Sequence, residues 1–90
     1  QHKASIGGEV VHLTALEMEL LRYFATNQDR VLSREELLAE VWQLPNYPNT
    51  RTVDNFVMRL RRQFEPNPAS PVYFLSIRGR GYKFTANGVR

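Results

Sequence analysis

Apolar residues recur at helical spacing in three stretches of the chain. In each stretch they fall mostly three or four residues apart, which places them on one face of a helix. The predicted helices cover residues 14–27, 33–42 and 50–65. Their apolar faces consist of Leu16, Leu20, Leu21 and Phe24; of Leu37, Leu38, Val41 and Trp42; and of Val53, Phe56, Val57, Leu60 and Phe64.

The first two helices begin with matching capping signals. Thr14 is followed three residues later by Glu17, and Ser33 is followed three residues later by Glu36. In such a capping box, each side chain accepts a hydrogen bond from the backbone N–H of the other residue. We therefore expect both helix starts to be closed in this way.

Short β-forming runs flank the helical part. Residues 3–13 hold two such runs separated by Gly7–Gly8, which predicts a small hairpin that includes His12 as a plain strand residue. Residues 72–85 hold two more around the sequence Arg-Gly-Arg-Gly at 78–81. Glycine permits a tight bend there, so we expect a second hairpin with two arginines at its tip.

A loop separates the second and third helices. The segment 43–49 contains two prolines and no helical spacing, and Asn49 or Thr50 supplies the N-cap of the helix that follows. The predicted fold is one α+β domain over residues 1–90, with short N-terminal strands, three helices and a C-terminal hairpin. This order of elements is that of a winged helix-turn-helix, with the second hairpin as its wing.

Composition excludes several classes of function. The chain has 90 residues, no cysteine and two histidines, so we expect no disulfide, no metal site and no cofactor. No catalytic or nucleotide-binding motif is present, which argues against an enzyme. The apolar runs are too short for a membrane span, and we expect a cytoplasmic protein with no membrane partner.

Charge is distributed unevenly along the chain. Residues 1–50 have a formal charge of −3, whereas residues 51–90 have +6, and seven of the eight bases in this second part are arginine. At 100° per residue, the outward face of the third helix carries Arg51, Asn55, Met58 and Arg62, with Arg59 on one shoulder. Arginine suits phosphate and guanine because its planar fork donates two hydrogen bonds at once.

Two functions fit this layout. The basic third helix is the right size to fit into a DNA major groove, and an arginine on the wing can reach the adjacent minor groove. Winged helices also serve as protein-interaction modules with weak or no DNA binding, so the order of elements alone leaves both open. A solvated helix face and a charged turn would explain the charge without any partner.

Four motifs resemble a known family, the DNA-binding domain of OmpR/PhoB-type response regulators. The similarity runs from about Ile6 to Thr85, with the motifs in the same order and spacing. They are Leu13 to Leu21 (LTALEMELL); Arg30 to Leu38 (RVLSREELL), with Val41-Trp42 after it; Arg51 to Asp54 (RTVD), followed by Arg59 to Arg62 (RLRR); and Ser76 to Phe84 (SIRGRGYKF).

The resemblance implies a C-terminal output domain of a two-component transcription factor. Such a factor has an N-terminal receiver that a sensor kinase phosphorylates, and it binds double-stranded DNA at tandem direct repeats as a dimer. No receiver is present in this chain, which begins at Gln1, so we expect a piece of a longer protein that is monomeric by itself.

The resemblance also implies a set of site residues. Arg59 is expected at a base, Arg51 and Arg62 at phosphates, and Arg78 in the minor groove. The loop 43–49 corresponds to the segment that contacts RNA polymerase in activators. The recognition-helix candidates are Arg51, Thr52, Asp54, Asn55, Phe56, Met58, Arg59 and Arg62; the wing candidates are Ser76, Arg78, Arg80 and Tyr82; Trp42 is a candidate for the DNA backbone; and Leu44, Asn46, Tyr47 and Asn49 are candidates for the polymerase.

Several of these positions have a structural explanation as well. We expect Trp42 to pack in the core and to offer its indole N–H to DNA in addition. Asp54 near a helix start stabilises the helix dipole, and Arg61 can pair with Glu65 one turn later. Phe56 occupies a position where many members of the family carry a polar or basic residue, and Met58 one where arginine is common, so these two departures reduce the polar contacts available to DNA.

Overall fold

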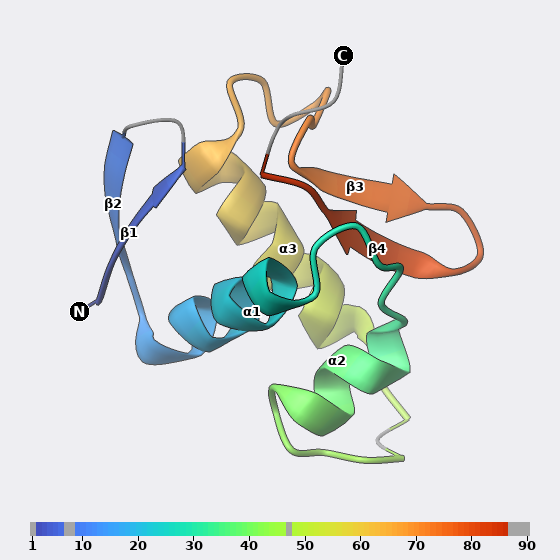
Figure 1. Cartoon of the computed structure of the whole chain (residues 1–90). Coiled ribbons are helices and arrows are strands. Elements are labelled where there is room, and N and C mark those ends of the chain that lie inside the picture. Colours follow the sequence, from blue (N-terminus) through green and yellow to red (C-terminus); the bar gives the residue numbers. More distant parts are fainter. Residues whose placement is uncertain (1, 7–8, 47, 87–90) are drawn as a thin grey trace.

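The computed structural model describes residues 2–6, 9–46 and 48–86. The helices form the centre, with one antiparallel hairpin on either side (Figure 1). This arrangement confirms the predicted α+β winged helix. The elements are β1 (His2–Ile6), β2 (Glu9–Leu13), α1 (Ala15–Thr26), α2 (Arg34–Glu40), α3 (Arg51–Phe64), β3 (Phe74–Ile77) and β4 (Gly81–Phe84). The predicted Gly7–Gly8 turn lies outside the described residues.

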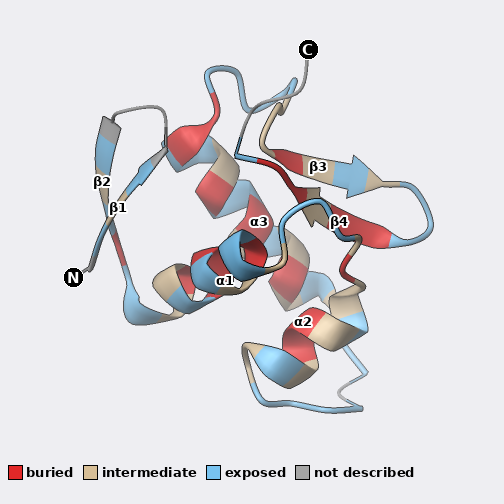
Figure 2. Ribbon diagram, viewed as in Figure 1, coloured by how far each residue is buried: buried red, intermediate tan, exposed pale blue. Residues whose placement is uncertain are grey.

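The core draws on all three helices and on both hairpins (Figure 2). Phe74 of β3 packs its ring against Phe24 of α1 and Phe84 of β4, at centroid distances of 5.7 and 5.0 Å. Such aromatic pairs add to the free energy gained by burying apolar surface. The apolar faces predicted for the helices are buried except for Leu16, Val41, Trp42 and Phe56, which are half-buried.

The two predicted capping boxes differ in the structure. At the start of α1 the box is complete, because Thr14 and Glu17 each accept from the other's backbone N–H. At the start of α2, Ser33 Oγ accepts from the N–H of Glu36 at 3.0 Å. The carboxylate of Glu36 instead binds Tyr23 and Arg30. The second capping box therefore has only the hydrogen bond that Ser33 accepts, and the prediction that Glu36 would accept in return was wrong.

Helix α2 is shorter than predicted. It ends at Glu40, and the backbone turns away through Gln43, which has a φ of 59°. The N–H of Leu44 returns to the carbonyl of Leu38 at 2.9 Å, so the last turn closes without further helix. As a consequence Trp42 follows the helix instead of ending it.

Glu65, just after α3, determines where the wing begins. Its buried carboxylate accepts from the N–H groups of Val72, Tyr73 and Phe74 at 2.8 to 3.3 Å. The N–H groups of Val72 and Tyr73 are therefore not available for a strand ladder, and β3 starts at Phe74, two residues later than predicted. The same contact fixes the wing to the end of α3.

The inner strand of the wing also pairs with the segment between α1 and α2. Leu32 and Tyr82 exchange backbone hydrogen bonds of 2.7 and 2.9 Å. This close approach requires glycine next to Tyr82: Gly81 has a φ of 139°, and an added Cβ would lie 2.1 Å from the carbonyl oxygen of Leu32. The wing is thus fixed at both its start and its centre.

In the described part of the chain, no helix has the length and apolar character needed to cross a bilayer.

Candidate nucleic-acid interface

The outward face of α3 is a stripe of four exposed residues. Arg51, Asn55, Met58 and Arg62 follow one another at intervals of four, three and four residues. Among the residues that the structure describes, none makes a hydrogen bond or ion pair with any of these four side chains. Their functional groups are therefore open to an external partner. We call these four residues the outward stripe.

On the side of α3 that faces the wing, Arg61 binds other groups of the protein through two of its three guanidinium nitrogens. Arg61 donates from Nε and Nη2 to the carbonyl of Phe74, at 3.0 and 2.7 Å, and from Nη2 to Ser76 Oγ at 2.8 Å. The predicted Arg61–Glu65 pair is wrong, since Glu65 binds the backbone of the wing instead. Ser76 is exposed, and its hydroxyl keeps a free side toward solvent.

Asp54 joins three elements on the same side. Its Oδ1 accepts from Tyr82 Oη at 2.6 Å and from Arg34 Nε at 2.7 Å. Burial raises the pKa of Tyr82 first, and the carboxylate of Asp54 raises it further. The hydrogen bond to Asp54 likewise raises the pKa of Arg34. Both Asp54 and Tyr82, which were predicted to lie at the DNA, are thus engaged in holding the wing against α3 and α2.

The opposite shoulder of α3 carries an aromatic cluster. Trp42 and Phe56 pack edge to face at 5.1 Å, and both are half-buried against the core. The guanidinium of Arg59 lies 4.4 Å from the centre of the Phe56 ring and 4.0 Å from Glu17 Oε2. Arg59 is half exposed. Its guanidinium is therefore accessible but already attracted by two groups of its own domain.

The tip of the wing presents two further arginines. Arg78 and Arg80 are exposed, and the described residues offer neither side chain a hydrogen bond or ion pair. The turn closes through the N–H of Arg80 and the carbonyl of Ile77 at 2.9 Å. Gly79 takes a φ of 73° between the two arginines, a conformation that glycine adopts without strain.

The loop 43–49 is exposed where the structure describes it. Leu44 is 40% exposed, and Asn46 has a φ of 63°, which asparagine tolerates. Asn49 Oδ1 accepts from the N–H of Arg51 at 2.9 Å, whereas the N-cap residue Thr50 makes no capping bond with its side chain. Tyr47 lies outside the described residues.

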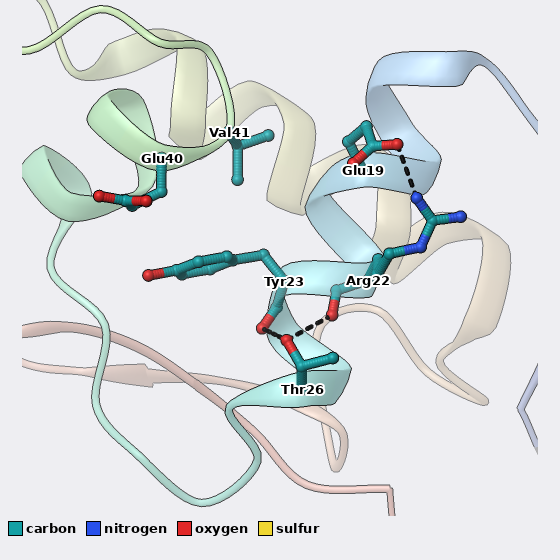
Figure 3. A pocket seen from close by; sticks show the side chains of 6 residues that line it. All are labelled: Glu19, Arg22, Tyr23, Thr26, Glu40 and Val41. Carbon is teal, nitrogen blue, oxygen red and sulfur yellow. Dashed lines mark hydrogen bonds and ion pairs between the residues drawn. The ribbon is translucent and has the colours of Figure 1, made fainter.

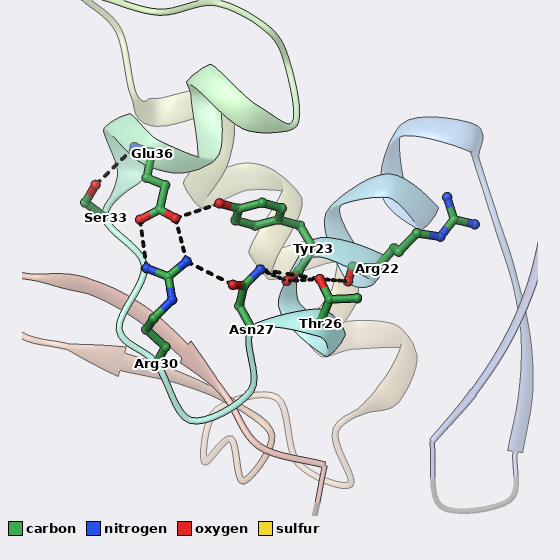
Figure 4. Close-up of polar contacts among 7 residues, drawn as sticks. All are labelled: Arg22, Tyr23, Thr26, Asn27, Arg30, Ser33 and Glu36. Atoms are coloured by element: carbon green, nitrogen blue, oxygen red, sulfur yellow. Dashed lines mark hydrogen bonds and ion pairs between the residues drawn. The ribbon is translucent and has the colours of Figure 1, made fainter.

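Away from α3, a polar network connects α1 to α2 (Figure 4). Glu36 accepts from Tyr23 Oη at 2.6 Å and from Arg30 Nη2 at 2.8 Å, and Arg30 also donates to Asn27 Oδ1. Burial acts to raise the pKa of Glu36, but the hydrogen bonds from Tyr23 and Arg30 lower it below its usual value. Burial and Glu36 together raise the pKa of Tyr23. This network connects α1, the segment after it and α2.

Among the residues that the structure describes, the surface has a smaller and a larger depression that bear on the site. The smaller, about 190 Å³, lies between α1 and the end of α2 (Figure 3), and its Glu19 and Arg22 pair with each other at 2.7 Å. The larger, about 700 Å³, lies between α3, β3 and the segment that joins them. Met58 forms part of its rim, together with Leu75 and Pro71.

Sequence reasoning missed two residues of this region, Arg34 and Glu17. A signal existed for Arg34, because a base in the first turn of a helix is disfavoured by the helix dipole and so indicates a specific partner. Glu17 was assigned to the capping box alone, and nothing in the local pattern pointed to Arg59, which lies 42 positions later.

The protein family described as "Transcriptional regulatory protein, C terminal" matches residues 8–84. The chain belongs to this family. Its sequence is 41% identical over 83 residues to the sensory transduction protein RegX3 of Mycolicibacterium smegmatis. The aligned residues cover 92% of this chain and 36% of that protein. It is 37% identical over 82 residues to the transcriptional regulatory protein YvrH of Bacillus subtilis, covering 91% and 35%. The chain thus spans little more than a third of these relatives.

Solved structures agree with this assignment. The response regulator DrrB of Thermotoga maritima, an OmpR/PhoB homologue, superimposes with a TM-score of 0.77 at 38% identity, over 87% of this chain and 35% of that one. The DNA-binding domain of CpxR from E. coli superimposes with a TM-score of 0.74 at 33% identity, over 91% and 80%. The chain is the C-terminal effector domain of an OmpR/PhoB-type regulator.

Proposed function

We propose that this domain binds double-stranded DNA in a sequence-specific manner and thereby controls transcription, with α3 in the major groove and the wing in the minor groove. The observation that carries the proposal is the contrast on α3 itself. The wing-facing side chains Asp54 and Arg61 bind other parts of the protein, while Arg51 and Arg62 remain open at the two ends of the outward stripe. No catalytic step forms part of this function.

The proposed contacts follow from exposure and charge. Arg51 and Arg62 neutralise phosphates, Arg59 reaches a base edge after leaving Phe56 and Glu17, and Arg78 enters the minor groove. Thr52 lies on the same shoulder of α3 as Arg59, and its hydroxyl and the indole N–H of Trp42 are the proposed donors to the DNA backbone. Ser76, whose hydroxyl oxygen accepts a hydrogen bond from Arg61, donates a hydrogen bond to a phosphate. Arg80 adds charge at the wing.

Asp54, Phe56 and Tyr82 act differently from the other candidates. Each is engaged within the domain, Asp54 with Tyr82 and Phe56 with Trp42. We propose that they shape the DNA-binding surface and that the groups they hold make the contacts. The carboxylate of Asp54 then does not repel the nearby phosphates, because its ion pair with Arg34 compensates its charge.

The remaining partners concern the whole regulator. We propose that a receiver domain, phosphorylated by a sensor kinase in the cytoplasm, precedes this domain and drives dimerisation on tandem direct repeats. Loop 43–49 is the proposed contact for RNA polymerase, through Leu44, Asn46 and Asn49, with Tyr47 as the fourth residue predicted there. Its support is that Leu44 is a large apolar side chain exposed on a polar loop.

Selection of bound duplexes from a random pool tests the function. The 90-residue chain should enrich one motif, and its affinity for that motif should fall linearly with salt on a log–log scale, by about 0.9 per phosphate neutralised. Replacing Leu44 by Ser is the matched control, since it changes a surface that the proposal keeps away from DNA. Equal affinity for all duplexes, or affinity independent of salt, would contradict the proposal.

A further inference from the structure

The centre of the outward stripe is apolar, unlike its ends. Met58 is 47% exposed, and it is the one large exposed hydrophobic residue among the described residues of α3. Arg51 and Arg62 stand at the ends of the stripe, about 16 Å apart along the helix axis. A major groove is about 12 Å wide, so two arginines at this spacing reach the phosphates on its two sides. The residues between them, Asn55 and Met58, then face the base edges.

A methionine in that position cannot read bases by hydrogen bonding. Its thioether has no donor and only a weak acceptor. The major-groove edges of unmodified DNA present one apolar group, the C5-methyl of thymine. Asn55 lies three positions earlier on the same face, and asparagine pairs with N6 and N7 of adenine through two hydrogen bonds. Both residues at the centre of the stripe thus match the two halves of an A·T pair.

We propose that Met58 is a specificity-determining residue that recognises a thymine methyl group, with Asn55 on an adenine of the same or the adjacent base pair. The inference rests on the proposed DNA binding and gives it a chemical preference. The domain would therefore select A·T pairs at the centre of its half-site, where an arginine at position 58 would select guanine. Leu75 and Pro71 line the same surface depression as Met58, so the side chain has apolar neighbours within the domain.

Replacing thymine by uracil tests the inference, because uracil lacks only the methyl group. Each thymine of the selected duplex is replaced in turn, and affinity is measured by fluorescence anisotropy. Wild-type protein should lose about fourfold at one or two positions, the factor expected for one buried methyl group. Met58→Gln, which has a similar length but a polar end, should bind thymine and uracil duplexes equally. Met58→Leu should keep the thymine preference.

Three results of the uracil and selection experiments would overturn the inference. They are equal binding of thymine and uracil duplexes by the wild type, a uracil effect that persists in Met58→Gln, and a selected motif without thymine. Loss of a protein partner in Met58→Gln with unchanged DNA affinity would also overturn it and would assign Met58 to the depression beside β3. In each case, salt-dependent binding of the wild type to the selected duplex shows separately whether the proposed function stands. Thermal unfolding of both variants confirms that they fold.

Discussion

Arg61 and Arg62 are neighbours on α3, yet they belong to two different regions. Arg61 faces the wing and uses two of its nitrogens on Phe74 and Ser76, whereas Arg62 belongs to the outward stripe, where the described residues provide no partner. The same residue type thus stabilises the fold in one position and is available for binding in the next. Charge alone cannot distinguish the two roles, because what decides them is the direction in which each side chain leaves the helix.

Among substitutions that remove contacts between α3 and the wing, Glu65→Ala should lower the stability of the fold most. The substitution removes a carboxylate that accepts from three backbone N–H groups and leaves those groups without their partner. Hydrogen bonds to a charged group contribute roughly 1.5–3 kcal/mol each, and they are not additive. Urea denaturation should show a loss of at least about 3 kcal/mol in the free energy of unfolding. A loss under about 1 kcal/mol would show that the contact does not hold the wing.

Arg61→Ala and Arg62→Ala form a matched pair that tests the contrast directly. Arg61→Ala should lower the free energy of unfolding by about 1–3 kcal/mol, because it leaves a carbonyl and a hydroxyl unpaired. Arg62→Ala should change it by less than about 0.5 kcal/mol and should instead reduce the salt slope of DNA binding by about 1. Denaturation and anisotropy on both variants provide the two readouts. If the two variants lost the same stability and the same salt dependence of DNA binding, the distinction between the two arginines would be wrong.

Tyr82→Phe should have a smaller effect. It should lower the free energy of unfolding by about 0.5–1.5 kcal/mol at neutral pH, because it deletes the hydrogen bond to Asp54. The pKa of Tyr82 is raised in the folded state by burial and by Asp54, so the folded protein holds this proton more tightly than the unfolded chain. Stability should therefore be fully present below about pH 10 and fall as pH rises above it. Tyr23 contributes in the same direction.

The phenylalanine variant separates the two tyrosines. In Tyr82→Phe the alkaline loss of stability should become shallower but persist, because Tyr23 remains. Unchanged pH dependence between pH 9 and 11 would contradict the role of Tyr82 as a buried donor to Asp54.

Glu17→Gln should produce the smallest effect, a gain in DNA affinity of up to about fivefold. Glutamine keeps the capping box with Thr14 but removes the charge 4.0 Å from Arg59. Glu17 is buried but Arg59 is half exposed, so the pair contributes about 0.2–1 kcal/mol. Glu19→Gln is the control, since it removes the same charge from the same helix, where the partner is Arg22. A gain of the same size in both variants would reflect net charge alone.

The sequence predicted what local pattern determines. The three helices and the box between Thr14 and Glu17 follow from residues a few positions apart, and the structure contains them. The box at Ser33 is incomplete because Tyr23 and Arg30 compete for the carboxylate of Glu36, and neither lies within its helix. A single sequence does not show which of several partners a carboxylate will choose.

Contacts between distant segments could not be predicted. Asp54 meets Tyr82 28 positions later, and Arg61 meets Phe74 13 positions later, only because the wing docks on α3. Helical geometry therefore identified the outward stripe correctly as a face but not the engagement of its neighbours. The residue-by-residue roles at the DNA stay predictions.

The position of the DNA on the domain is tested most directly by an NMR titration of the labelled chain with the selected duplex. We predict that the largest amide shifts fall along α3 at Arg51, Asn55, Met58 and Arg62, with a second group at Arg78 and Gly79 on the wing. Shifts concentrated instead on the loop 43–49, or on the depression between α1 and α2, would contradict binding through the outward stripe.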